Sequence, residues 1–365
     1  MDYEIDTRCI HGEGHKYEDG NNSISYPIYQ TASFSHLTPG HNPNGFDYSR
    51  ESNPTRAYLE ETVSSLEHAV DTIAFASGMA AIATAFEYFK PGDHIILGED
   101  LYGGVVRLIK QICEKNGYET EYVDTTDVDK IKAAIKENTK GIYFESPTNP
   151  MMRITNIQAA AKIAHEAGAI LIVDNTFMTP VYQNPILEGA DIVVHSGTKY
   201  LSGHNDTVCG FLCVASKELS EKFRLYAKTT GATLGPFECW LCLRGLKTLA
   251  IRMERHKSNA EAVVVYLKGK EEVEEIYYAG TGIISFTVNS VDTALKLLRN
   301  IKLITFAESL GGTESLLTYP TVQTHPDVPV EQKLKLGITD RLLRLSVGIE
   351  NPKDIIADLE GAFHG

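Results

Sequence analysis

Ser196, Thr198 and Lys199 form the stretch of the chain whose residue types and spacing most clearly indicate chemistry. They follow an apolar run typical of a buried strand, and a second run of this kind ends in Asp174. An amine, two hydroxyls and a carboxylate at strand ends are what pyridoxal phosphate (PLP) needs. The lysine forms a Schiff base, the hydroxyls bind the phosphate, and the aspartate keeps the pyridine nitrogen protonated. Taken alone, such a stretch is more often a surface lysine after a core strand, because short motifs match by chance.

A second candidate phosphate site lies at Ser77, Gly78 and Met79, between a predicted strand and a predicted helix. Ser77 suits a helix N-cap, and Gly78 lets the backbone approach a ligand closely. The first N–H groups of such a helix, together with its dipole, favour a phosphate. The alternative is a tightly packed strand–helix turn without a ligand.

Three further polar side chains stand at places where a cofactor or substrate could meet them. Tyr102, in a Tyr-Gly-Gly turn, could stack on a planar ring, and Asn149, between two prolines, could donate to a phenolic oxygen. Arg344 interrupts an apolar strand, where a buried guanidinium needs an anion such as an amino-acid carboxylate. The alternatives are a packed loop aromatic, ordinary turn chemistry and an internal ion pair.

Composition narrows the class of protein. The 365 residues carry a net charge of −14 and contain no long basic run, which argues against nucleic-acid and anionic-membrane partners. No apolar stretch approaches the ~20 residues of a membrane span, and the acidic N-terminus does not resemble a signal peptide. We therefore expect a cytoplasmic protein. The close pairs Cys209/Cys213 and Cys239/Cys242 suggest packing rather than zinc binding, and we expect no metal.

The order of predicted elements indicates an α/β fold. Residues 1–50 have little periodicity and are predicted to be an extended arm, followed by a large domain over 51–235 and a smaller α/β domain over 236–365. Apolar strands that alternate with helices predict a parallel sheet covered on both faces, with ligands at the carboxyl ends of the strands. The predicted strands of the large domain are 72–76, 94–97, 120–123, 141–145, 169–173, 191–195 and 210–214, and its main helices are 54–67, 127–137 and 157–167. A long helix at about 246–267 is followed by strands 283–288, 303–306 and 342–347 and helices 292–300 and 353–363.

Eight ordered motifs, which together extend over nearly the whole chain, resemble the PLP-dependent enzymes of Cys/Met metabolism. This family contains the cystathionine γ-synthases, β-lyases and γ-lyases. The resemblance implies PLP-dependent transferase fold type I, with a seven-stranded, mostly parallel sheet in the large domain and a smaller C-terminal α/β domain. The motifs are residues 48–50 with 53–56, 77–81, 102–104, 147–150, 173–177, 195–200, 308–312 and 344–350.

The resemblance also implies roles for individual residues. Lys199 is the Schiff-base lysine, Asp174 pairs with the pyridine nitrogen, and Tyr102 stacks on the ring and takes a proton from the incoming amine. Tyr48 and Arg50 reach the cofactor phosphate of a neighbouring subunit, so the active unit is a dimer or a tetramer. The phosphate is held by Gly78, Met79, Ser196 and Thr198, and cofactor and substrate are oriented by Asn149, Glu308, Ser309 and Arg344.

Three details of the sequence favour chemistry at the substrate's γ carbon. Glu308 resembles γ-synthases and γ-lyases, since β-lyases of one branch carry an aromatic residue there. The short connection 278–283 and the stretches 318–320 and 323–325 resemble bacterial synthases that use O-acylhomoserine. Arg107 could meet a distal carboxylate or lie on a helix surface. The first hypothesis is a cystathionine γ-synthase that joins an O-acylhomoserine to cysteine, with sulfide as another donor.

Two other readings of the function stay open at this point. A cystathionine β- or γ-lyase would use the same machinery to cleave cystathionine to pyruvate or 2-oxobutyrate. A non-enzymatic oligomer that binds a phosphate-bearing ligand belongs to another class, although simple binding does not need a Schiff-base lysine. The acyl group, the sulfur donor and the size of the oligomer are not encoded in any of these motifs.

Overall fold

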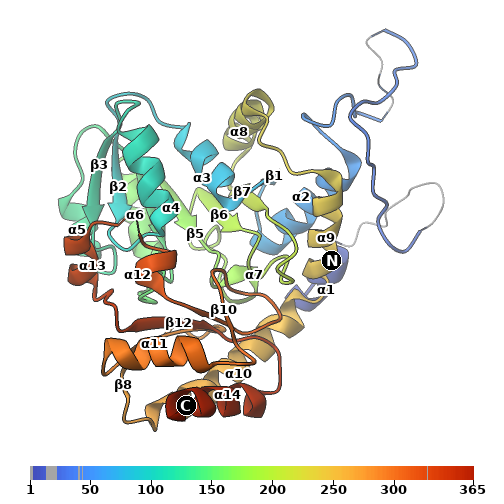
Figure 1. The fold of residues 1–365 in the computed structure, drawn as a ribbon. Coiled ribbons are helices and arrows are strands. Elements are labelled where there is room, and N and C mark those ends of the chain that lie inside the picture. The colour runs from blue at the N-terminus through green and yellow to red at the C-terminus, as the bar shows by residue number, and fades with distance from the viewer. Residues whose placement is uncertain (1–2, 14–22, 40–41, 43, 327) are drawn as a thin grey trace.

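Two β-sheets organise the chain (Figure 1). The computed structural model describes residues 3–13, 23–39, 42, 44–326 and 328–365. Part of the arm predicted for residues 1–50 therefore lies outside the described residues. Over those ranges, none of the helices combines the length and the apolar character that a membrane span requires.

The first sheet has seven strands in the order β1-β7-β6-β5-β4-β2-β3. The pairs β2–β3, β2–β4, β4–β5 and β5–β6 are parallel, whereas β7 runs antiparallel to both β6 and β1. The predicted seven-stranded, mostly parallel sheet is confirmed. Its strands are β1 (Asp71–Phe75), β2 (His94–Gly98), β3 (Glu119–Val123), β4 (Thr139–Glu145), β5 (Ile170–Asp174), β6 (Ile192–Ser196) and β7 (Gly210–Val214).

Apolar side chains alternate between two cores, one on each face of this sheet. Val173 and Val193 pack in the core that includes helices α2 (Pro54–Glu67) and α6 (Ile157–Glu166). Their neighbours Ile172 and Val194 pack in the core with α3, α4 and α8. Burial on both faces explains why these strands are continuously apolar in sequence. The remaining helices of this region are α3 (Gly78–Phe86), α4 (Gly103–Leu108), the π-helix η1 (Ile109–Cys113), α5 (Val128–Ala133), α7 (Thr179–Tyr182), α8 (Lys217–Thr230) and α9 (Pro236–Leu246).

The second sheet has five strands in the order β10-β11-β12-β9-β8 and is mainly antiparallel, with only β10 and β11 parallel. One face packs against α10, α11 and α14. Leu343 and Leu345 of β12 belong to that core, so the intervening Arg344 points to the opposite face. The elements are β8 (Val273–Tyr278), β9 (Ile283–Val288), β10 (Thr305–Phe306), β11 (Leu316–Thr318), β12 (Leu342–Ser346), α10 (Leu249–Lys268), α11 (Val291–Asn300), α12 (Pro320–Gln323), α13 (Val330–Leu336) and α14 (Pro352–His364).

Two features differ from the predicted division of the chain. Helix α1 (Ile5–His11) packs on α2 and α10, and its Cys9 is only 2% exposed, so this part of the arm joins its own chain's core. Residues 1–50 show little periodicity, so this helix was not predicted from the sequence. Cys242 of α9 and Met253 of α10 pack in the same core as the first sheet. We therefore propose that the second domain begins within α10, rather than at residue 236.

Candidate active site

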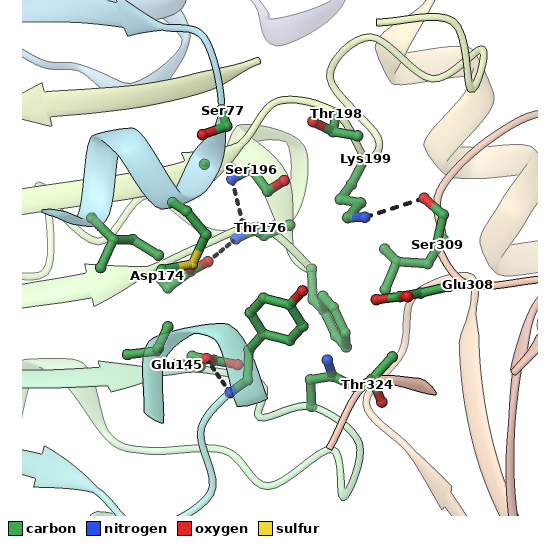
Figure 2. A pocket seen from close by; sticks show the side chains of 18 of the residues that line it. Ser77, Glu145, Asp174, Thr176, Ser196, Thr198, Lys199, Glu308, Ser309 and Thr324 are labelled. Atoms are coloured by element: carbon green, nitrogen blue, oxygen red, sulfur yellow. Dashed lines mark hydrogen bonds between the residues drawn. The ribbon is translucent and has the colours of Figure 1, made fainter. Parts of the chain in front are cut away.

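A cavity of about 230 Å³ lies at the carboxyl ends of β4, β5 and β6, and residues of the C-terminal part, such as Glu308 and Ser309, also line it (Figure 2). Residues from both parts of the chain line it, and most of the site residues predicted from sequence are among them. Those residues are Gly78, Met79, Tyr102, Asn149, Asp174, Ser196, Thr198, Lys199, Glu308, Ser309 and Arg344.

Lys199 reaches across the cavity from the turn that follows β6. Its Nζ donates a hydrogen bond of 3.1 Å to the Ser309 hydroxyl, which comes from the C-terminal part of the chain. Burial lowers the pKa of Lys199 to about 8, and the positive charge of Arg344 acts in the same direction, whereas Glu308 opposes it. A useful fraction of the amine is therefore unprotonated near neutral pH, as a nucleophile or a base requires.

Asp174 ends β5 and is tied to the next strand through Thr176. The Thr176 N–H donates to Asp174 Oδ1 at 2.9 Å, and the Thr176 hydroxyl accepts from the Ser196 N–H at 2.9 Å. Burial raises the pKa of Asp174, opposed by its hydrogen bonds to Thr176 and by His195. A buried carboxylate of this kind gains from a cation placed against it. A protonated pyridine nitrogen fits that requirement.

The start of α3 forms the end of the cavity where a phosphate would fit. The Ser77 hydroxyl caps the helix by accepting from the Ala80 N–H at 3.1 Å. A Cβ added at Gly78 would lie 2.9 Å from Ser196 Cα, so the close approach of these two segments requires glycine. Unpaired N–H groups of the first helical turn, beside the Ser196 hydroxyl, suit a phosphate. The Thr198 hydroxyl donates to the Cys209 carbonyl and accepts from the Cys209 N–H, so its proton is engaged here and its bond to the phosphate stays a prediction.

Arg344 supplies a buried positive charge from the face of β12. It is 1% exposed, and its guanidinium donates to Asn149 Oδ1 at 2.8 Å and to the Ser309 carbonyl at 3.0 Å. It forms no ion pair with any residue that the structure describes, and its Nε has no partner there. The internal ion pair that the sequence also allowed is therefore not formed in this part of the chain. An anionic ligand would compensate the charge.

Ser309 is held in an unusual backbone conformation, with a φ of +124°. Few residues other than glycine adopt such a φ, and they do so mostly where the surrounding contacts enforce it. Here the Ser309 carbonyl accepts from Arg344 while its hydroxyl accepts from Lys199. The strained residue thus connects the two cationic groups of the cavity.

Several lining residues escaped the sequence analysis as site candidates. Glu145 ends β4 as Asp174 ends β5, and the same strand-end signal could have found it. Thr324 follows α12, and only the folded chain brings it to the cavity. Ser77, which the sequence predicts as the N-cap of a phosphate-binding helix, also lines the cavity, and the remaining lining residues are Ile82, Val105, Pro147, Thr176, Phe177, Val208 and Leu310.

Tyr48 and Arg50 are not brought to this cavity within the single chain. They line a separate cavity with Gly231–Pro236, where an Arg50 nitrogen donates to the Lys228 carbonyl at 2.5 Å. Arg107 is exposed on α4. Their roles stay predictions.

Tyr102 does not yet match its expected role as a proton acceptor. Burial raises the pKa of Tyr102, with a further contribution from Glu308, and Arg107 opposes it. The protein groups alone thus favour the protonated hydroxyl. That Tyr102 takes a proton from the substrate amine stays a prediction.

Comparisons with known proteins agree with this geometry. The Cys/Met metabolism PLP-dependent enzyme family matches residues 6–364. A cystathionine gamma-synthase of Haemophilus influenzae is 44% identical over 99% of this chain and 98% of its own, and a cystathionine gamma-lyase of Bacillus subtilis is 43% identical over 98% of each. The crystal structure of cystathionine gamma-lyase from Lactobacillus plantarum complexed with L-serine has a TM-score of 0.95, 40% identity and 99% coverage of both chains.

These findings confirm the predicted fold type I and pyridoxal phosphate as cofactor. The amine, the buried carboxyl and the helix N-terminus of the cavity all fit that cofactor. The chain belongs to the Cys/Met metabolism PLP-dependent enzyme family.

Proposed function

We propose that the protein is a cystathionine γ-synthase, which joins an O-acylhomoserine to cysteine and releases the carboxylic acid. The observation that carries the proposal is that Glu308 and Thr324 line the cavity beside Lys199 and Ser309. A glutamate at the position of Glu308 resembles the γ-synthases and γ-lyases, whereas β-lyases of one branch carry an aromatic residue there. Thr324 belongs to the stretch 323–325, which resembles the synthases that use O-acylhomoserine.

The first task of the site is to hold the amino-acid end of the substrate. Arg344, with its free Nε, would bind the α-carboxylate, and Asn149 would keep the guanidinium in place through its 2.8 Å bond. The Ser309 hydroxyl accepts a hydrogen bond from Lys199 Nζ, and it would accept one from the substrate's amine when that amine replaces Lys199. These contacts direct the Cα–H bond toward the lysine.

The second task is proton transfer. When bound, pyridoxal phosphate withdraws electrons from Cα and so makes the protons on Cα, and then on Cβ, acidic enough to remove. Lys199 takes the Cα proton with its neutral amine, which its lowered pKa makes available. One flexible lysine stem can serve both carbons. Loss of the Cβ proton expels the acyl group as a carboxylate. The cysteine thiol then gives up its proton as it forms the new C–S bond at Cγ, and Lys199 would return one proton to Cβ and one to Cα.

The second candidate function is a cystathionine γ- or β-lyase. It is favoured by the nearly equal similarity of the chain to relatives named as synthase and as lyase. A lyase needs the same lysine, the same carboxylate site and the same cofactor, so the common machinery of the cavity does not distinguish the two reactions.

Product analysis tests the proposal. The holoenzyme is incubated with O-acetyl- or O-succinylhomoserine and cysteine, and separately with cystathionine alone, with Lys199→Ala as the blank. We expect cystathionine in the first reaction and little 2-oxo acid in the second. Pyruvate or 2-oxobutyrate from cystathionine, with no thioether formed in the first reaction, would establish a lyase instead. Replacing cysteine with sulfide tests for an additional sulfhydrylase activity.

We also propose that two chains share each active site. Tyr48 and Arg50 are exposed, and neighbouring segments present apolar side chains such as Ile24 and Leu37 to solvent. An arm of this kind can bury its apolar surface on a second copy and bring Arg50 to that copy's phosphate. Mixing inactive Arg50→Ala with inactive Lys199→Ala subunits should restore activity. Mixed dimers that stay inactive would oppose a shared site.

A further inference from the structure

Glu145 is a buried carboxyl in the cavity wall to which neither the motifs nor the proposed reaction assigns a task. It ends β4 and is the register partner of Asp174 on β5, so the two carboxyls leave neighbouring parallel strands side by side. It is 7% exposed and lines the cavity (Figure 2). A charge-bearing residue is rarely this buried without a specific role.

The contacts of Glu145 lead directly to Tyr102. Glu145 Oε1 accepts a hydrogen bond of 2.8 Å from the Tyr102 backbone N–H, at the N-cap position of α4. The Tyr102 ring lies over the first turn of that helix, because a Cβ added at Gly104 would come within 2.4 Å of it. Backbone and ring are therefore both restrained, one by Glu145 and the other by the contact with Gly104.

We infer that Glu145 is a positioning residue, whose carboxyl fastens the Tyr102 backbone to the end of β4 and so holds the tyrosine ring in the cavity that Asp174 also lines. Its effect reaches the cofactor through Tyr102. The inference concerns the cofactor site and does not depend on whether the enzyme is a synthase or a lyase.

The surroundings of Glu145 disfavour its anion, whereas its contact with the Tyr102 N–H needs only an acceptor oxygen. Burial raises the pKa of Glu145 well above its ordinary value, and the neighbouring Asp174 and Asp100 act in the same direction. The N–H groups of Tyr102 and Asn149 oppose the shift. Two adjacent buried carboxyls do not both ionise readily. Asp174 has Thr176 and His195 to stabilise its anion, so the surroundings disfavour the anion at Glu145 more than at Asp174.

Two substitutions separate position from charge. Glu145→Gln keeps the length and the acceptor oxygen but cannot ionise, whereas Glu145→Asp keeps the carboxyl but is one methylene too short to reach Tyr102. Glu137→Gln, at an exposed carboxyl ahead of β4, is the matched control. Cofactor affinity is measured by titrating the apoprotein with pyridoxal phosphate, and the visible circular dichroism of the holoprotein reports how the bound ring is held. Thermal unfolding of each apoprotein shows whether the variant folds.

We expect Glu145→Gln and the control to bind the cofactor within about threefold of the parent, with an unchanged dichroic band. Glu145→Asp should bind about tenfold more weakly, as expected for one lost hydrogen bond, and its band should change. If Gln is as impaired as Asp, or more so, the charge matters and the inference is wrong. It is equally wrong if both variants match the parent. A wrong reaction assignment would change neither readout, because no substrate is present.

Discussion

The seven-stranded sheet contributes to the cavity from the ends of its strands, whereas the five-stranded sheet contributes from the face of one strand. Asp174 and Glu145 stand at carboxyl ends, because both faces of their sheet are covered by apolar cores. Arg344 stands in the middle of β12, on the face opposite the core with α10, α11 and α14, and this second face borders the cavity. A sheet with apolar cores on both faces has only the ends of its strands for chemistry, whereas a sheet whose second face borders a cavity can place a charge within a strand.

The strand ends of the first sheet and the strand face of the second are proposed to bind different molecules. The strand ends hold the groups proposed to meet the cofactor. The cavity-facing side of the second sheet, with the segment around Ser309, holds the groups proposed to meet the substrate. Substitutions in the first set should therefore reduce turnover. Those in the second set should mainly weaken substrate binding.

The largest effect is expected from Lys199→Ala. Removing the amine takes away both the covalent attachment and the proposed base, so turnover should fall by at least about 10⁴-fold. The absorbance band of the bound cofactor near the visible edge should vanish as well. Substantial turnover with the lysine absent would contradict its assignment to the chemical step.

Asp174→Asn should produce the second largest effect. The amide cannot stabilise a positive ring nitrogen, so kcat should fall by about 10²–10³-fold with KM changed far less. Asp129→Asn, at an exposed aspartate of α5, serves as the control and should leave both constants unchanged. A change confined to KM would remove the distinction between the two sheets.

Arg344→Lys is expected to show the reverse pattern. A lysine keeps the positive charge but loses the planar set of donors, so KM for the amino-acid substrate should rise by about tenfold to hundredfold while kcat changes less. Steady-state kinetics with the same substrate as for Asp174→Asn give the comparison directly. A fall in kcat without a rise in KM would place Arg344 in the chemical step.

The smallest effect is expected from Glu308→Gln, and it concerns pH. The neutral amine of Lys199 reacts with aldehydes, so the reaction of the apoprotein with pyridoxal should accelerate as pH rises through about 8, the pKa of Lys199. Glu308 raises that pKa, and its removal should lower the midpoint and increase the rate at pH 7 about twofold to fivefold. Arg344→Met should move the midpoint upward. A midpoint that neither substitution moves would show that the second sheet does not act on the lysine.

Much of the site could be predicted because its residues interrupt regular patterns. Asp174 ends an apolar run, Lys199 comes shortly after another, and Arg344 interrupts a third, so each of these residues is conspicuous in the sequence. Glu145 carries the same strand-end signal and was nevertheless missed, since a single glutamate after an apolar run is unremarkable without its neighbour Asp174. Thr324 reaches the cavity only through tertiary contacts that no local pattern encodes.

The fold was predictable to a similar degree and for similar reasons. Helix α2 begins and ends where the sequence predicts, because Asn53 caps it and Pro54 occupies its first turn. The antiparallel direction of β7 was not predictable, since an apolar strand is the same in either direction. The start of the second domain stays a proposal, which rests on the packing of α9 and the beginning of α10 in the core of the first sheet.

Helix α10 has a consequence for how the molecule denatures. Its Met253 packs with the seven-stranded sheet and its Val263 with the five-stranded sheet, so one continuous rod of 20 residues is anchored in both. Melting either core would expose apolar side chains on the same helix and so weaken the other core's hold on it. Heating should therefore give one calorimetric transition for the two sheets together. The surroundings of Lys199 and Arg344, which line the same cavity, should unfold at the same temperature.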